Sequence, residues 1–169
     1  KYPAIQTYKA YSKKNPSVTA RFSTGPNGFH AVINSPDKMI YIDPYSKQDQ
    51  NFYTVYYTND HEDASLRNTS LCGTEHYVND QVKGPKWGTR SFLDGKMEMR
   101  KYRLALACTG EWGALRGSTE KALSDMVTFV ERANILFEAE LAIRMILVAN
   151  NDVLINLDGT TDSYSEPEK

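Results

Sequence analysis

The pattern of apolar residues changes near residue 100, and this change limits what the 169-residue chain can fold into. Before it, apolar and polar residues alternate in short runs separated by turn-forming residues, which is typical of strands in an antiparallel sheet. After it, apolar residues recur at three- and four-residue steps, the pattern of a helix with one buried face. The chain therefore combines a β-rich region with a region built around a long helix, an α+β organisation.

The first 58 residues predict an antiparallel meander or sandwich. Residues 17–24 place Val18, Ala20 and Phe22 on one face of a strand. Residues 25–28, Gly-Pro-Asn-Gly, then reverse the chain, because proline fixes φ and Asn-Gly tolerates positive φ. Further short strands are expected at residues 5–9, 29–33, 39–43 and 52–57.

Residues 59–100 form a connecting segment with no sustained period and many small polar residues. A segment this long inside a compact domain is usually functional or a linker. Its charged end predicts an exposed stretch, in which the dibasic pair Arg100 and Lys101 is a candidate processing site. We therefore divide the chain into residues 1–58, 59–100 and 101–169.

Residues 101–169 predict a strand, a helix and a second strand. Residues 102–108 are a mostly apolar run suited to a sheet covered on both faces, and residues 143–148 resemble them. Ser118 or Thr119 can cap the helix between them. Its apolar stripe comprises Leu123, Met126, Val127, Val130, Ala133, Phe137 and Leu141. This order indicates a right-handed β-α-β unit with parallel strands. Such a unit leaves one sheet face and one edge uncovered, and we expect later sequence or another chain to cover them.

Charge and hydropathy exclude several classes of function. The chain has 20 basic and 21 acidic residues, a net charge of -1 and no long block of either sign, so we expect no nucleic-acid partner. The longest mostly apolar stretch, residues 141–148, is far shorter than the roughly 20 residues that cross a bilayer, so we expect no membrane span. The sequence also lacks a glycine-rich phosphate loop and a nucleophile elbow.

Residues 101–155, from KYRLALACTGEWGALRG to IRMILVANNDVLI, resemble the start of the catalytic domain of bacterial reprolysin-like zinc metallopeptidases, in the metzincin clan. Residues 2–57, with YPAIQTY, TARF, GFHAVI and YIDPYSK, resemble the propeptide ahead of that domain in secreted members. The resemblance implies the N-terminal segment of a secreted or extracellular protease zymogen, acting on peptides or proteins. Residues 1–58 would be a propeptide that assists folding and blocks the active site, and residues 101–169 would begin a metzincin-type α/β catalytic domain.

The metal-binding motif of that family is missing from this sequence. The family holds zinc through the histidines of H-E-x-x-H-x-x-G-x-x-H, with the glutamate as general base. The nearest string here, residues 61–65 (HEDAS), has Ser65 in place of the second ligand. None of the three histidines, His30, His61 and His76, lies four residues from another. Zinc is therefore expected from residues outside this chain, and the remainder of the catalytic domain, or a second chain carrying it, is the expected partner. We expect His30 on the outer face of the sheet.

Cys72, in the string Leu-Cys-Gly-Thr, resembles the Cys-Gly core of the cysteine switch of metzincin propeptides. In a switch, the thiolate occupies the open position on zinc, and cleavage at Arg100-Lys101 would release it. Two other interpretations remain open: Cys72 pairs with Cys108 in an oxidising compartment, or it is free. Cys108 itself, at the end of an apolar run, also fits a small buried hydrophobic residue.

The acidic segment 158–162 (DGTTD) suggests calcium by composition but lacks EF-hand spacing, so we expect an exposed loop. Glu111, in a glycine-flanked loop, is expected to be a surface acid. The alternative to a protease segment is a non-catalytic interaction module, in which a sheet rich in the 11 tyrosines binds a protein or a surface.

Overall fold

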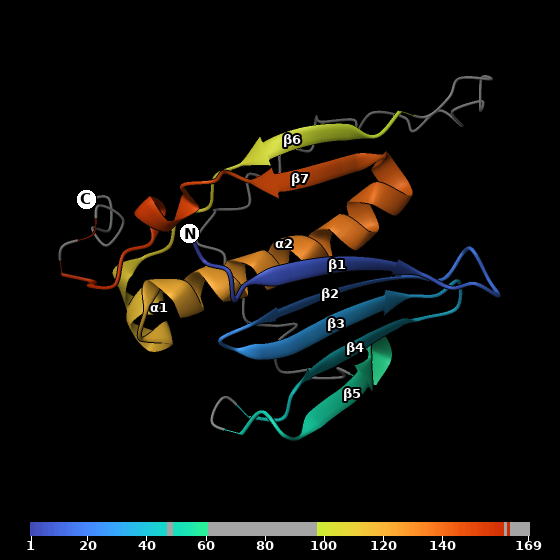
Figure 1. Ribbon diagram of the computed structural model, residues 1–169, viewed down its shortest axis with the longest axis horizontal. Coiled ribbons are helices and arrows are strands. Elements are labelled where there is room, and N and C mark those ends of the chain that lie inside the picture. The colour runs from blue at the N-terminus through green and yellow to red at the C-terminus, as the bar shows by residue number, and fades with distance from the viewer. Residues whose placement is uncertain (47–48, 61–97, 161, 163–169) are drawn as a thin grey trace, which may run out of the picture.

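The computed structural model describes residues 1–46, 49–60, 98–160 and 162. These residues form a five-stranded antiparallel sheet, two helices and a two-stranded parallel sheet, which confirms a mixed α+β architecture (Figure 1). Cys72 and the histidines at positions 61 and 76 lie outside the described residues.

The N-terminal sheet is a meander in which each strand pairs with the next along the chain. Its strands are β1 (Gln6–Tyr11), β2 (Thr19–Gly25), β3 (Gly28–Asn34), β4 (Met39–Pro44) and β5 (Tyr53–Tyr57), and the short 3-10 helix η1 (Thr58–Asp60) follows. The predicted turn is confirmed, because Gly25 pairs with Gly28 across a two-residue loop. Gly28 has φ +97°, a conformation that favours glycine.

The C-terminal half contains the predicted strand-helix-strand unit. Its elements are β6 (Arg100–Leu104), α1 (Gly110–Arg116), α2 (Thr119–Leu141), β7 (Ile143–Leu147) and the 3-10 helix η2 (Asn151–Leu154). β6 and β7 are parallel, as predicted, with Tyr102 opposite Met145. Ser118 caps α2, since its hydroxyl accepts a hydrogen bond from the Lys121 backbone N–H. Helix α1 was not predicted; Thr109 caps its start, and Gly117 ends it with φ +76°.

The first strand of this unit differs from the prediction in position and in burial. It begins at Arg100 and ends at Leu104, and Tyr102 is 49% exposed. The reason is that α2 packs mainly on β7, so that the β6 side chains from Arg100 to Arg103 are exposed on both faces of the strand. Beyond Leu104 the chain leaves the β6–β7 ladder, and the Asn151 side chain bonds both backbone groups of Leu106. Parallel pairing resumes only at Cys108, which forms an isolated bridge with Ile155.

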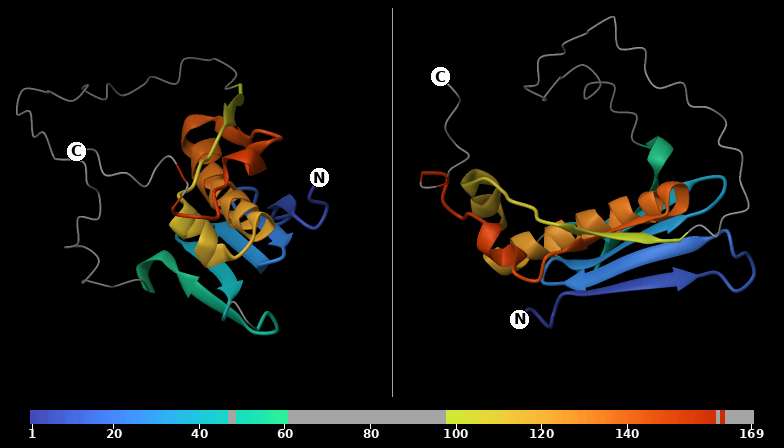
Figure 2. Two further views of the ribbon diagram at one scale, coloured as in Figure 1. Left: turned by 90° about the vertical axis from the view of Figure 1, so that its left-hand side faces the viewer. Right: turned by 90° about the horizontal axis from the view of Figure 1, so that it is seen from above.

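Helix α2 lies between the two sheets, with β6 and β7 on one side and the meander on the other (Figure 2). The apolar core lies on the β7 side, where Ala122 and Met126 meet Ile155. Leu106, Cys108, Trp112, Leu123 and Leu147 pack around it. The predicted stripe is thus correct at Met126 and Val130, which are buried, but wrong at Leu141, which is 53% exposed at the end of the helix.

The meander turns its polar face toward α2. Arg21 and Ser23 of β2 are buried against the helix, whereas Phe22, between them, points to the opposite side. His30 pairs with Ser23 in the register and therefore shares the helix-facing side. Our prediction that His30 lies on the outer face is wrong, because we assumed that the apolar face of the strand would be the covered one.

Candidate functional site

The meander contacts α2 through a set of polar and charged side chains, which we call the docking interface. Arg21 of β2 is its most buried member, with 2% of its surface exposed. One end of its guanidinium donates to Glu131 and the other to Glu138, both on α2. A buried cation held by two carboxylates fixes how the sheet sits on the helix, although such pairs add little net stability.

Glu138 connects three elements of the fold to α2. Besides Arg21 of β2, it accepts a hydrogen bond from the Lys9 amino group of β1 at 2.6 Å. The Arg144 guanidinium of β7 lies 3.5 Å from the same carboxylate. Burial raises the pKa of Glu138, but the hydrogen bonds from Lys9 and Arg21 outweigh burial and hold this pKa below its ordinary value. Glu138 is therefore ionised at neutral pH and holds β1, β2 and β7 together.

Asp43 of β4 forms a second ionic cluster in the docking interface. Its carboxylate lies 2.5 Å from the His30 ring nitrogen Nδ1 and accepts a hydrogen bond from the Tyr56 hydroxyl at 2.6 Å. Arg132 of α2 donates to the same carboxylate. Burial raises the pKa of Asp43, yet hydrogen bonds from His30 and Tyr56 and the charge of Arg132 lower it overall. Burial and the bond to Asp43 raise the pKa of Tyr56 to about 12.

Neutral contacts complete the docking interface near the start of α2. The hydroxyls of Ser23 and Thr128 lie 2.8 Å apart and are buried. The Asn27 side-chain amide donates to the Lys121 carbonyl at 2.8 Å. The end of β2 approaches α2 so closely that a Cβ added at Gly25 would lie 2.5 Å from the Ser124 hydroxyl. A glycine is needed there because of this approach.

A cleft of about 700 Å³ opens beside the Asp43 cluster, between the meander and the two helices. Cys108, Trp112 and Phe129 line it together with Asp43 and Arg132. The Cys108 thiol is half-buried and lies 3.7 Å from the Asn156 carbonyl, so Cys108 packs as a small hydrophobic residue at the edge of the core. Among the residues that the structure describes, Cys108 forms no disulfide.

The described residues do not fit a zinc site. Within residues 1–46, 49–60, 98–160 and 162, no three His, Cys, Asp or Glu side chains come together as a group that could hold a metal ion. His30, the one histidine in these ranges, is engaged with Asp43. The zinc that the resemblance implies would therefore have to be bound by other residues.

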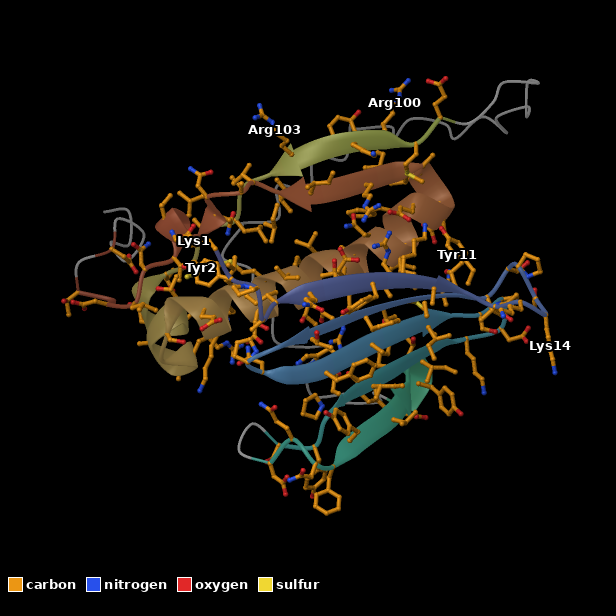
Figure 3. All side chains as sticks on the ribbon, in the orientation of Figure 1. Lys1, Tyr2, Tyr11, Lys14, Arg100 and Arg103 are labelled. Atoms are coloured by element: carbon orange, nitrogen blue, oxygen red, sulfur yellow. The ribbon has the colours of Figure 1, made fainter. Side chains whose placement is uncertain are left out.

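The candidate processing pair lies at the start of β6. Arg100 and Lys101 pair with Ile143 and Arg144 of β7, and both side chains are exposed. Figure 3 shows the side chains of Arg100 and Arg103 pointing away from the rest of the molecule. A protease can reach these side chains, but the Arg100 backbone N–H is bonded to the Ala142 carbonyl at 2.8 Å. Cleavage at this pair requires that the first residues of β6 detach from β7.

The acidic C-terminal segment folds back on itself and on α1. The Asp158 carboxylate accepts hydrogen bonds from the backbone and hydroxyl of Thr160, at 2.8 and 2.7 Å. The Asp162 carboxylate accepts one from the Gly110 backbone N–H at the start of α1. Glu111, predicted in a loop, lies in the first turn of this helix and is exposed.

Our sequence analysis missed the charged residues of the docking interface. The alternation in residues 17–24 puts Arg21 on the face opposite Val18, Ala20 and Phe22, and alternation alone favours burial of the apolar face. Glu131 and Glu138 are seven residues apart and therefore lie on one face of α2, two turns from each other. The seven-residue spacing of these glutamates and the arginine in the middle of a strand are the sequence features that could have predicted the ion pairs.

Comparisons with protein families, with curated proteins and with solved structures find no match for this chain. No helix in the part of the chain that the structure describes is long and apolar enough to span a membrane.

Proposed function

We propose that this chain is the N-terminal segment of a secreted zinc endopeptidase zymogen. In this proposal residues 1–58 are a propeptide that assists folding and blocks the active site, and residues from 101 onward are the first β-α-β unit of the catalytic domain. The single observation that carries the proposal is the polar character of the docking interface. A propeptide must be held in a defined orientation and then leave.

A polar interface suits such a removable domain. Interfaces between separable domains are more polar than a continuous hydrophobic core. Here Arg21, Asp43 and Lys9 on the meander side face carboxylates and Arg132 on α2. Once the meander dissociates, water can hydrate these charged α2 side chains. An apolar helix face would instead remain exposed to water at a cost in free energy. The apolar core on the other side of α2 stays intact.

The edge of the small sheet supports a β-α-β unit that is continued by further strands. The outer edge of β7 is covered, because the Asn134 side chain bonds both backbone groups of Met145 at 2.8 Å. β6 is bonded to the β7 side through Arg100 and Leu104. The backbone groups of the intervening Lys101 and Arg103 point to the opposite edge, where no described strand pairs. A larger sheet would grow at this edge of β6.

Cys72 and the Arg100-Lys101 pair keep the roles that the resemblance gives them in this proposal. Cys72 would bind the zinc through its thiolate and keep the attacking water away. Cleavage at Arg100-Lys101 would separate the propeptide from the catalytic domain. The zinc ligands would be supplied by residues beyond those described, so no catalytic step is assigned to the described side chains.

The decisive experiment uses the precursor that carries this segment. We expect the purified precursor to contain zinc and to cleave peptides only after processing near Arg100-Lys101, as read by mass spectrometry of both fragments and by a fluorogenic peptide assay. Cys72→Ser is expected to release activity before processing. A precursor that binds no zinc and has no peptidase activity after processing would contradict the proposed function. Unchanged latency in Cys72→Ser would remove the switch role alone.

A further inference from the structure

The side of the meander that faces away from α2, which we call the outer face, is almost entirely apolar. The register places Tyr8 beside Phe22, Phe22 beside Ala31, Ala31 beside Ile42 and Ile42 beside Val55, in one row across all five strands. The same alternation adds Ala10, Ala20, Phe29, Ile33, Ile40, Tyr53 and Tyr57 to the outer face, together with the polar Gln6 and Thr24 at one end. None of these side chains carries a charge at neutral pH, and the nearby Lys38 amino group lies 4.1 Å from the centre of the Tyr57 ring.

The outer face is open to solvent at its two edge strands, whereas Ala31 in its central strand is buried by its neighbours, with 6% of its surface exposed. Val55 is 60% exposed, and Tyr8, Tyr53 and Tyr57 are 44%, 42% and 39% exposed. An antiparallel sheet with one covered face normally presents polar side chains to water. This meander does the reverse, because its charged face is the covered one. A large exposed apolar patch of this kind marks an interaction surface.

Aromatic rings on the outer face contact one another in a continuous row. Tyr8 stacks on Phe22 with ring centroids 4.9 Å apart, Phe22 lies 5.7 Å from Phe29, and Phe29 meets Tyr53 edge-on at 6.1 Å. Rings that already pack against each other lose little side-chain freedom when a partner covers them. The outer face is therefore ordered before it binds.

We propose that the outer face is a dimer interface whose occupant is the outer face of a second copy of this chain. A neutral face meets its own copy without like-charge repulsion, which a charged face would not. Two apolar sheet faces pack about 10 Å apart with interdigitating side chains, which gives a two-layer sandwich of the two meanders. The docking interface and β6 lie on the other side of each meander, so both copies keep them.

The size of the outer face is at the lower limit for a specific dimer interface. Five strands and about six residues per strand give a footprint of roughly 24 by 20 Å, or about 1,000 Å² for both copies. Specific interfaces start near this area, and stable ones bury about 1,200 to 2,000 Å². We therefore expect a reversible dimer that dissociates on dilution.

Sedimentation-velocity measurements on the 169-residue chain, from about 1 to about 200 µM, test the proposal directly. We expect a concentration-dependent shift from monomer to dimer. Val55→Lys places a charge in the outer face of each copy, on an edge strand that tolerates it, and is expected to weaken the dimer at least ~10-fold. Tyr57→Lys is a second variant with the same expected effect.

Val153→Lys is the matched control, because Val153 is also exposed, at 67%, but belongs to η2. It is expected to dimerise like the unchanged chain, and circular dichroism confirms that each variant is folded. A chain that stays monomeric at about 200 µM overturns the proposal. A dimer that both outer-face lysines leave intact, or that Val153→Lys disrupts equally, also overturns it.

Discussion

The two sides of α2 bind their neighbours in different ways. On the β7 side, Ala122 and Met126 pack into an apolar core with Ile155. On the meander side, the contacts are mainly ion pairs and hydrogen bonds centred on Arg21 and Asp43, with the buried Val32 beside Arg21 in the register. Apolar burial supplies most of the stability of a fold, whereas buried ion pairs mainly determine which arrangement forms. This difference supports our proposal that α2 and β7 belong to one unit and that the meander is a separable one.

The largest expected effect is on the apolar side. Met126→Asp would place an unpaired charge in the core and should lower the free energy of unfolding by about 4 kcal/mol. Urea unfolding followed by circular dichroism measures this loss. Phe129→Asp is the control, because Phe129 lies on the same helix but is 64% exposed, and it should cost well under about 1 kcal/mol. Equal losses in the two variants would mean that Met126 is not a core residue.

A smaller effect is expected on the meander side. Arg21→Met leaves Glu131 without its described cation and deprives Glu138 of one, so it should weaken docking of the meander by about 3 kcal/mol. Hydrogen exchange should then rise in β1 to β3 and stay low in the β7 side of α2. Arg103→Met, on the exposed side of β6, is the control and should change neither the docking of the meander nor its hydrogen exchange. Uniformly faster exchange throughout the chain would show that the two sides form one cooperative unit.

Lowering the pH should weaken the meander side of α2 and leave the apolar β7 side intact, without any mutation. The pKa values of Glu138 and Asp43 are both lowered in the folded chain, so each carboxylate stabilises docking above its unfolded pKa, near 4. That contribution is lost as the pH falls from there through the lower folded pKa values. We expect the exchange protection of the meander, taken relative to the intrinsic exchange rate at each pH, to fall below about pH 4 while Met126 and its neighbours stay protected. Exchange protection of the meander that does not change with pH would contradict the ionic account of the docking interface.

The smallest expected effect is on the helix itself, which both sides share. Ser118→Ala removes the side chain that caps α2 and should lower the free energy of unfolding by about 1 kcal/mol. Thermal unfolding measures this loss. Ser118→Asp is the control, because aspartate also caps a helix and should retain most of the stability that Ser118→Ala loses. A loss confined to one sheet would mean that α2 does not connect the two.

The sequence predicted most elements but not how they face each other. The alternation at Val18, Ala20 and Phe22 and the stripe through Met126 and Val130 are local patterns, and they located β2 and α2 correctly. The choice of covered face depends on contacts between residues more than a hundred positions apart, such as Arg21 with Glu131. Apolar alternation alone favours the wrong face here, and for that reason His30 was misplaced.

Helix α1 was missed for a different reason. Gly110 and Gly113 are poor helix formers and were assigned to a loop. A Cβ added at Gly113 would lie 1.8 Å from the Asn156 carbonyl, so glycine is required by the close approach of the C-terminal segment. Tertiary packing therefore outweighs helix propensity at this position, and no local pattern reports such a contact.

The central claim is that the meander is a separable unit whose docking on α2 requires that its buried charges stay paired. It is tested most directly by cutting the chain within residues 96–101 and measuring, by size-exclusion chromatography, whether the meander fragment stays with the helical fragment. We expect the fragments to co-elute at neutral pH and low salt, and to separate at pH 3 or when Arg21→Met is present, with the helical fragment still folded. Fragments that stay together under all of these conditions, or a helical fragment that unfolds on separation, would contradict the claim.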